Sequence, residues 1–147
     1  MLVEFRHRSW LDDEHRAETL AFLEQHRLSH VVVDEPRDDS ARNLVPTVVA
    51  ATTPFAYVRF HGRNLGTWNK RGGGAQERFD YLYARGELEE WVEPLRELSG
   101  EAQQVYAMFN NNNRAADPKA ELGWVAQAAT NAVELRNVLH AADVPVA

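Results

Sequence analysis

The sequence predicts an α/β fold in which a mainly parallel sheet is covered by helices. Segments with the pattern of strands alternate along the chain with segments of helical periodicity, and this order favours parallel strands joined by helical crossovers. Residues 30–34, His-Val-Val-Val-Asp, form a nearly continuous apolar run. Such a run is typical of a parallel strand that is buried on both faces.

The composition indicates one globular domain over residues 1–147. Hydrophobic residues make up 44% of the chain and aromatic residues 10%, which is enough for a core at this ordinary domain length. The chain has no cysteine, so disulfides and thiolate metal sites are excluded. No segment reaches the ~20 apolar residues of a membrane span, and the first residues lack a signal-peptide pattern. We therefore expect a cytoplasmic protein with no membrane partner.

The first third of the chain predicts two strands and one helix. Residues 2–7 alternate apolar and charged side chains, as a strand does. Residues 9–13 then supply a capping serine and acidic first-turn residues for an amphipathic helix that ends near His26. The apolar run 30–34 is the second strand. Residues 35–53, which contain prolines, predict an irregular segment with at most a short strand or helical turn.

A third strand lies in the stretch 57–64, Tyr-Val-Arg-Phe-His-Gly-Arg-Asn. Alternation along an extended chain places Tyr57, Arg59 and His61 on one face. A loop of about twenty residues follows, and loops of that length in compact domains are commonly functional. Its glycines, tryptophan and tyrosines indicate a loop that folds back over part of the domain.

The last third predicts two helices and one strand. Residues 87–102 carry an apolar stripe of helical spacing, with a bend or restart expected at Pro94 because proline removes an amide donor. Residues 104–109 alternate as the fourth strand. An irregular loop separates this strand from a terminal helix over residues 127–140.

Each of the four predicted strands ends in polar residues. The ends are Arg6-His7, Asp34, His61-Gly62-Arg63 and Asn110-Asn111. Sites in parallel α/β folds lie at the carboxyl ends of the strands. We therefore expect these side chains to gather at one edge of the sheet.

Three of the polar side chains are candidate catalytic residues: His61, Glu4 and Asp34. Histidine serves as a general base or as a hydrogen-bond donor to an anion near neutral pH, and carboxylates transfer protons. For Glu4, which lies beside Arg6 on its own strand and Arg59 on another, a buried ion pair that fixes the strand register is the structural alternative. Mixed imidazole and carboxylate groups also suit divalent metals, but no fixed ligand spacing accompanies them, so we predict no metal site. The sequence identifies no cofactor.

Arginine and aromatic residues in the central stretch indicate a small anionic ligand. The net charge of −6 argues against general attraction to nucleic acid, but the planar guanidinium suits carboxylate and phosphate groups. Lys70 and Arg71 extend this basic stretch, with a solvated loop as the alternative. The candidate ligand-binding residues are Arg59, Arg63, Trp68, Tyr81, Asn110 and Asn111.

Four stretches together carry a family resemblance: Glu4-Phe5-Arg6-His7, the stretch 57–64, Phe109-Asn110-Asn111 and Ala126-Gln127-Ala128. They resemble the YecE-like family, a domain-of-unknown-function family of TIM-barrel proteins of the UPF0759 type. The resemblance spans essentially the whole chain and implies the C-terminal half of a (β/α)8 TIM barrel, with four mainly parallel strands and outer helices. It further implies which residues line the mouth or interior of the barrel: Glu4, Asp34, Arg59, His61, Arg63, Trp68, Tyr81 and Asn110.

The resemblance also implies a function. The family is distantly similar to sugar isomerases and apurinic endonucleases, so we expect a hydrolase-like or isomerase-like enzyme that acts on a polar or anionic, sugar- or nucleotide-like substrate. The alternatives are a non-catalytic module that binds nucleic acid or a sugar phosphate, and a truncated gene product without independent activity. A TIM barrel needs eight strands, so we expect a poorly stable monomer that a separately encoded N-terminal half or a homodimer completes.

Overall fold

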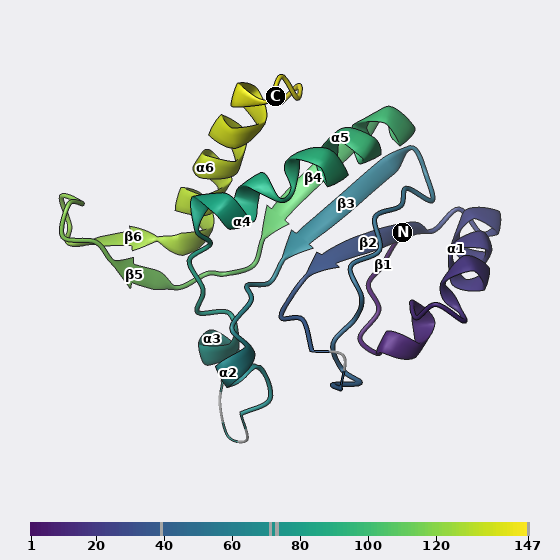
Figure 1. Cartoon of the computed structure of the whole chain (residues 1–147), viewed down its shortest axis with the longest axis horizontal. Coiled ribbons are helices and arrows are strands. Elements are labelled where there is room, and N and C mark those ends of the chain that lie inside the picture. Colours follow the sequence, from purple (N-terminus) through teal and green to yellow (C-terminus); the bar gives the residue numbers. More distant parts are fainter. Residues whose placement is uncertain (39, 71, 73, 147) are drawn as a thin grey trace.

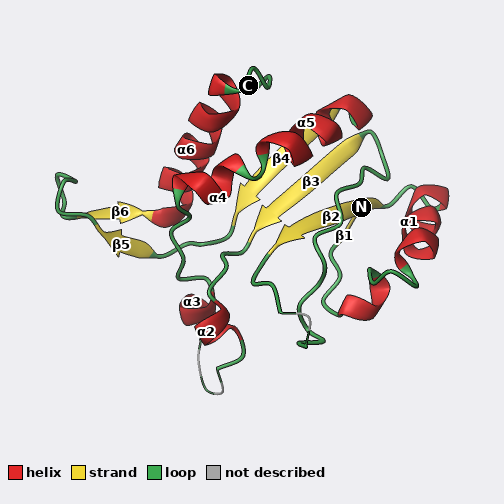
Figure 2. Cartoon of the chain, in the orientation of Figure 1, coloured by secondary structure: helices red, strands yellow, loops and turns green. Residues whose placement is uncertain are grey.

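The computed structural model describes residues 1–38, 40–70, 72 and 74–146, and its centre is a parallel sheet (Figures 1 and 2). The sheet contains β1 (Leu2–Val3), β2 (Ser29–Asp34), β3 (Phe55–Phe60) and β4 (Gln104–Phe109), in the spatial order β1-β2-β3-β4. All three neighbouring pairs are parallel. The predicted α/β fold with four parallel strands is confirmed.

Helices cover one face of the sheet, which we call the covered face. α4 (Arg85–Glu89), α5 (Val92–Glu101) and α6 (Gln127–Ala141) lie across β3 and β4 in Figure 1. Phe60 points into this layer, where its ring stacks on Phe109 at 4.5 Å and meets the edge of Trp91 at 4.9 Å. Burying an aromatic or aliphatic side chain of this size stabilises a fold by about 1.5–3 kcal/mol. The buried core is Val32, Ala56, Val58, Phe60, Tyr83, Leu88, Trp91, Leu95, Leu98, Leu135, Leu139 and Val144.

The opposite face, which we call the open face, has no helical cover among the described residues. Register places Val31 beside Tyr57 and Tyr57 beside Tyr106 on this side. The rings of Tyr57 and Tyr106 stack at 4.9 Å. Leu2 and Met108 are exposed here, so part of this surface is apolar and in contact with solvent.

The N-terminal segment departs from the predicted boundaries. β1 ends at Val3 and not at His7, because it pairs with β2 through only two residues. Residues Arg8–Trp10 form a 3-10 helix, and α1 (Arg16–Gln25) begins later than the expected first turn within residues 9–13. Asp12 accepts a hydrogen bond from the His15 amide at 3.0 Å just before α1. α1 is buried through Thr19 and Leu23.

The predicted helix over residues 87–102 is two helices, with the break before Pro94. α4 ends at Glu89 and α5 begins at Val92. Pro94 therefore lies in the first turn of α5, where a missing amide donor leaves no helical hydrogen bond unmade. The predicted terminal helix is confirmed as α6.

Both loops expected to lack regular structure contain short elements. The glycine-rich loop holds α2 (Leu65–Trp68) and α3 (Ala75–Arg78), which lie beyond the carboxyl ends of the strands in Figure 1. The loop before α6 forms an antiparallel hairpin of β5 (Arg114–Ala116) and β6 (Trp124–Ala126). The Arg114 guanidinium lies 4.1 Å from the centre of the Trp124 ring across this hairpin. The described part of residues 35–54 contains no helix or strand, as predicted.

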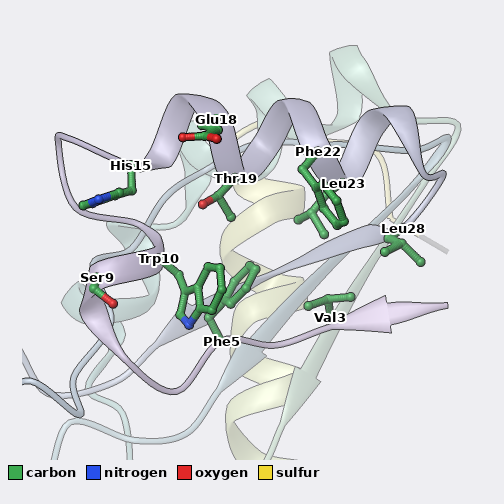
Figure 3. A pocket seen from close by; sticks show the side chains of 10 residues that line it. All are labelled: Val3, Phe5, Ser9, Trp10, His15, Glu18, Thr19, Phe22, Leu23 and Leu28. Atoms are coloured by element: carbon green, nitrogen blue, oxygen red, sulfur yellow. The ribbon is translucent and has the colours of Figure 1, made fainter.

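An apolar hollow lies between β1 and α1 on the covered face, and Figure 3 shows its lining. Its volume is about 600 Å³. Trp10 and Phe22 point into it although more than half of each side chain remains exposed. We call it the β1–α1 hollow; its lining residues are Val3, Phe5, Ser9, Trp10, His15, Glu18, Thr19, Phe22, Leu23 and Leu28. Within the described ranges, no helix has the length and apolar character to cross a membrane.

Candidate functional site

The polar residues at the strand ends separate into two clusters, one on each face of the sheet. The open-face cluster consists of Glu4, Arg6, Arg59, His61 and Asn110. The covered-face cluster consists of Asp34, Arg63, Tyr81, Tyr83, Glu87 and Glu90. The sequence predicted that the candidates gather at one edge of the sheet, and Glu4, Asp34, His61 and Arg63 do follow or end their strands at the carboxyl edge. They do not form one cluster, however, because Asp34 and Arg63 lie on the covered face and Glu4 and His61 on the open face.

Glu4 is the centre of the open-face cluster. Its Oε2 accepts from Arg59 Nη1 at 2.5 Å, and its Oε1 lies 2.6 Å from Arg6 Nη2 and 3.0 Å from His61 Nε2. Burial alone would raise the pKa of Glu4, but the hydrogen bond and electrostatic attraction of His61, the charge of Arg6 and the hydrogen bond from Arg59 outweigh it and lower the pKa to about 2. Glu4 is therefore ionised at neutral pH.

His61 is fully buried, with 0% of its side chain exposed. Asn110 Nδ2 donates to His61 Nδ1 at 3.2 Å, so the ring proton lies on Nε2, which donates to Glu4. Burial lowers the pKa of His61 and keeps the ring neutral at physiological pH. Both ring nitrogens are thus engaged within the protein.

The loop after β3 closes over His61 with two aromatic rings. Phe79 stacks on the imidazole at 5.5 Å, and Trp68 meets it edge-on at 6.3 Å. Arg78 lies over the Trp68 ring at 5.6 Å. Trp68, expected to line the mouth of a barrel, is buried and serves as cover for His61. Lys70 pairs with Glu77, and Arg71 lies outside the described residues.

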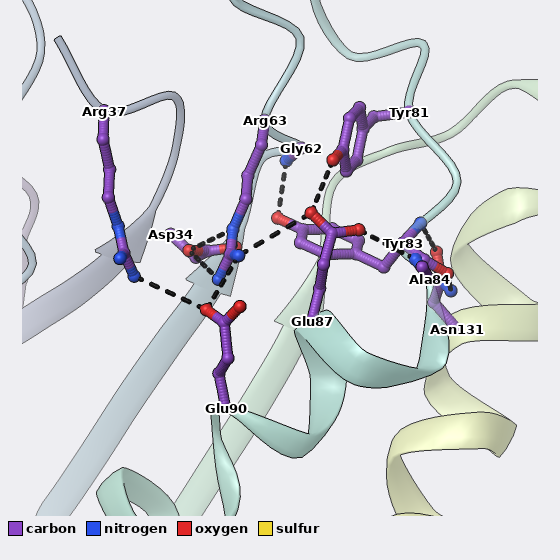
Figure 4. A network of polar contacts seen from close by, with 10 residues as sticks. All are labelled: Asp34, Arg37, Gly62, Arg63, Tyr81, Tyr83, Ala84, Glu87, Glu90 and Asn131. Carbon is purple, nitrogen blue, oxygen red and sulfur yellow. Dashed lines mark hydrogen bonds and ion pairs between the residues drawn. The ribbon is translucent and has the colours of Figure 1, made fainter.

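Arg63 is the centre of the covered-face cluster, shown in Figure 4. Its Nε lies 3.0 Å from Oδ2 of the fully buried Asp34, and its Nη1 donates to Glu90 at 2.9 Å. Burial would lower the pKa of Arg63, but the hydrogen bonds and charges of Asp34 and Glu90 outweigh it and raise the pKa above its usual value, so the guanidinium stays charged. Arg63 thus links Asp34, at the end of β2, to Glu90, the residue after α4.

Two tyrosines extend the covered-face cluster. Tyr83 accepts from the Gly62 amide at 2.8 Å and hydrogen bonds with Asp34; burial and the charge of Asp34 raise its pKa above the usual value. The Tyr81 hydroxyl donates to Glu87 at 2.6 Å. Burial and this hydrogen bond raise the pKa of Tyr81 to about 12. Tyr81, predicted to bind a ligand, is engaged here by the protein.

Gly62 explains why His61 and Arg63 point to different faces. Simple alternation would place both on the same side, but Gly62 has a φ of +89°, a conformation open to glycine and strained for other residues. A Cβ at Gly62 would also come within 2.6 Å of the Tyr81 Cβ. The chain therefore turns at Gly62 and carries Arg63 toward Asp34.

Asn111 also lies on the covered side. It is fully buried, and its Nδ2 donates to the Tyr81 carbonyl at 2.7 Å and to Asn131 Oδ1 at 2.8 Å. Asn131 in turn bonds both the amide and the carbonyl of Tyr83. Asn111 thus joins β4 to the loop before α4, whereas its neighbour Asn110 reaches the open-face cluster.

Glu35 is a buried carboxyl at the same edge that the sequence reasoning missed. It follows β2, has 2% of its surface exposed and accepts from the Val45 amide at 2.5 Å. Burial raises the pKa of Glu35 to about 7, with smaller opposing contributions from Val45 and Arg6. A carboxylic acid with this pKa exchanges its proton near neutral pH. The only signal in the sequence was its position after a strand.

Hollows reach the open-face cluster from two sides. One of about 270 Å³ is lined by Leu2, Glu4, Val31, Tyr57, Arg59 and Met108. Another of about 320 Å³ is lined by Gln76, Phe79, Asn110, Asn112 and Asn113. Within the described part of the chain, no three His, Asp or Glu side chains are placed to hold a metal ion. Glu4 and Arg59 thus place a carboxylate and a guanidinium at one hollow, and Asn110 places an amide at the other.

The chain matches known proteins across most of its length. Residues 1–143 match the family model "Protein of unknown function DUF72". The UPF0759 protein YunF of Bacillus subtilis is 40% identical over 115 residues, which are 76% of this chain and 40% of YunF.

Two solved structures are also similar to this chain. A crystal structure of a DUF72 family protein from Thermotoga maritima is 40% identical, with a TM-score of 0.72, and the match covers 95% of this chain and 45% of that one. A DUF72 family protein from Enterococcus faecalis is 31% identical, with a TM-score of 0.76 and coverage of 95% and 46%. The chain spans less than half the length of these relatives.

Proposed function

The chain belongs to the DUF72 family of proteins of unknown function, and from this membership and the open-face geometry we propose that it forms part of a cytoplasmic TIM-barrel enzyme for a small anionic substrate. The substrate class is a sugar- or nucleotide-like anion, and the reaction class is hydrolysis or isomerisation. The open face would be the inner wall of the barrel, and the covered face its outer wall. Substrate would meet the carboxyl ends of β1 and β3, where barrel enzymes hold their sites.

One observation carries the proposal: a single carboxylate holds two arginines at the carboxyl end of the sheet. Glu4 lies between Arg59 and Arg6, whose side chains are 31% and 54% exposed. Both guanidinium groups are therefore positioned by the protein and still reachable from solvent. A planar fork held in this way suits a carboxylate or phosphate ligand.

The roles of the predicted residues change with this geometry. Arg59 and Arg6 would bind the anion, and Glu4 would hold them in place. His61 would position Glu4 through its Nε2 proton, because both of its ring nitrogens are engaged and its ring is buried. Arg63 would stabilise the barrel wall, since Asp34 and Glu90 occupy it.

A binding module without catalysis is the second candidate, and one observation favours it. The open-face cluster has no free base: Glu4 is ionised with a pKa of about 2, and His61 has no available nitrogen. A site of this kind can hold an anion without transferring protons. The ligand would then be a sugar phosphate or a nucleic-acid backbone.

Ligand binding and turnover separate the two candidates. Purified protein is incubated with a mixture of sugar phosphates and nucleotides, and consumption and retention of each compound are measured by mass spectrometry. We expect Arg59→Met to abolish retention, whereas Arg136→Met, on the exposed surface of α6, retains it. Consumption of one compound by the wild type indicates an enzyme, and retention without consumption indicates a binding module. Equal behaviour of Arg59→Met and Arg136→Met would remove the open-face cluster from the proposal.

We further propose that another polypeptide covers the open face in the functional assembly, supplied as a separately encoded N-terminal half. The exposed Leu2, Tyr106 and Met108 support this idea, since contiguous apolar surface marks an interaction site. Light scattering after size exclusion, with and without the co-expressed upstream reading frame, tests it. A heterodimer is expected. A homodimer would replace the separate half with a second copy, and a stable, cooperatively melting monomer would contradict the proposal.

A further inference from the structure

We infer that the open-face site binds its anion together with a proton, and that Glu35 takes up this proton. The inference rests on the proposed function and deepens it, because it concerns the same arginines. It assigns Glu35 as a positioning group that adjusts the charge of the site. The proton comes from solvent and is released again when the anion leaves.

The surroundings of Glu35 differ from those of the other carboxyls at this edge. Asp34 and Glu4 each contact an arginine directly. Glu35 is buried like Asp34, but the Val45 amide is its only hydrogen-bond donor among the described residues. A carboxylate held by one neutral amide is far less stabilised than one paired with a guanidinium. The site therefore contains one acidic group that can become neutral at little cost.

An open hollow lies beside the residues that flank and hold Glu35. Val45 and Pro36, the residue after Glu35, both line an open hollow of about 430 Å³. Arg8, Arg37 and Asp38 line the same hollow and make it polar. A proton can thus reach this region from water without a change of the backbone.

The charges that act on Glu35 link it to anion binding. Arg6, which follows β1, favours its ionised form, whereas Glu4 and Asp34 oppose that form. Arg6 is also one of the two proposed anion-binding groups. An anion on Arg6 cancels the cation that helps to keep Glu35 ionised and adds a negative charge nearby. Both changes favour the protonated carboxyl, and the coupling is reciprocal: protonation of Glu35 strengthens anion binding.

Sulfate is a suitable probe because it does not titrate between pH 5 and pH 9. We propose calorimetric titration of the full chain with sodium sulfate at pH 7, in two buffers that differ in ionisation enthalpy. The difference between the two binding enthalpies measures the protons taken up. For a carboxyl that is about half protonated before binding, we expect an uptake of roughly half a proton. Affinity should then fall a few-fold from pH 6 to pH 8.

Glu35→Gln is the decisive variant, and Glu24→Gln, on the exposed surface of α1, is its control. We expect Glu35→Gln to bind sulfate with no proton uptake and no pH dependence between pH 6 and pH 8. The control should behave as the wild type. Proton uptake that persists in Glu35→Gln, or sulfate binding without proton uptake in the wild type, would overturn the inference and leave the proposed anion site intact. Absence of sulfate binding in the wild type would overturn the proposed site itself.

A second measurement covers the case in which Glu35→Gln does not fold. Carbon-13 NMR of side-chain carboxyls in the wild type follows Glu35 through its titration. We expect a midpoint that moves to higher pH when sulfate is added. A midpoint that does not move contradicts the inference without any variant.

Discussion

Replacing Glu4 with glutamine tests the centre of the open-face cluster. The substitution keeps the shape of the side chain but removes the charge that holds Arg59, at 2.5 Å, and Arg6, at 2.6 Å. It also places an amide donor where one oxygen now accepts from these cations or from His61. We expect the variant to fold with a lower free energy of unfolding and to lose anion binding, because the two guanidinium groups are no longer held together.

The size of the expected loss in unfolding free energy follows from the pKa of Glu4, which the fold lowers from 4.5 to about 2. Each tenfold change in a protonation equilibrium equals about 1.4 kcal/mol, so an unscreened pair would contribute roughly 3 kcal/mol. Arg6 is more than half exposed, and solvent screening reduces the contribution to about 1–2 kcal/mol. A carboxyl whose pKa is lowered by folding stabilises the protein above its unfolded pKa. This stability is lost as the pH falls from about 4.5 toward 2.

Urea denaturation followed by tryptophan fluorescence measures the effect at pH 6, 4 and 3. The difference in unfolding free energy between wild type and Glu4→Gln should be largest at pH 6 and shrink at each lower pH. Glu24→Gln makes the same change of charge on an exposed helix surface and should show a small difference at every pH. A Glu4→Gln difference that stays constant with pH, or that equals the control, would refute the ion-pair reasoning.

Three further predictions concern the turn, the covered-face cluster and the buried acid. Gly62→Ala should destabilise the fold by about 2–4 kcal/mol in thermal denaturation, since it adds backbone strain and a clash with Tyr81; a loss below 1 kcal/mol would contradict the turn geometry. Arg63→Met should lower the free energy of unfolding by about 3–5 kcal/mol, because Asp34 is left buried without its cation. In urea denaturation, the double variant with Asp34→Asn should recover part of this loss. Purely additive losses in the double variant would exclude the pairing. Folding raises the pKa of Glu35 from 4.5 to about 7, so its protonated form stabilises the protein below about pH 4.5 and this contribution is lost as the pH rises through 7. The unfolding free energy of Glu35→Gln should therefore rise relative to that of the wild type by about 1–3 kcal/mol between pH 5 and pH 8. Parallel pH profiles of the two proteins would show that Glu35 does not titrate in this range.

The sheet could be predicted from the sequence because its signals are local. The apolar run of β2 and the alternation in β3 and β4 appear directly in the order of residues. The helix of residues 127–141 likewise carries its own apolar stripe. By contrast, β5 and β6 are three residues each, too short for alternation to be distinguished from an irregular loop.

The candidate site was predictable only in part. Alternation correctly grouped Arg59, on β3, with His61, the residue after β3, since both contact Glu4. The Arg59–Glu4 contact matches the ion pair considered for Glu4. The alternation rule fails at Gly62, because one residue with positive φ reverses the side to which Arg63 points. No local pattern reveals such a turn.

Asp34 and Glu35 show a second limit. On a strand buried on both faces, an apolar run does not say which face its last side chain takes. Register with Phe60 puts Asp34 on the covered side. The environment of Glu35 depends on Val45, ten residues away in an irregular segment, and such segments have no periodicity from which packing can be predicted.

The β1–α1 hollow has a consequence for the protein in the cell. Its exposed Trp10 and Phe22 form the kind of surface that chaperones bind and that promotes aggregation when it stays uncovered. If the polypeptide proposed for the open face also extends past β1 to this hollow on the covered face, the amount of this chain should follow the amount of that polypeptide. Excess copies would be held by chaperones or degraded. The hollow would thus keep two gene products in matched supply without any regulation of their transcription.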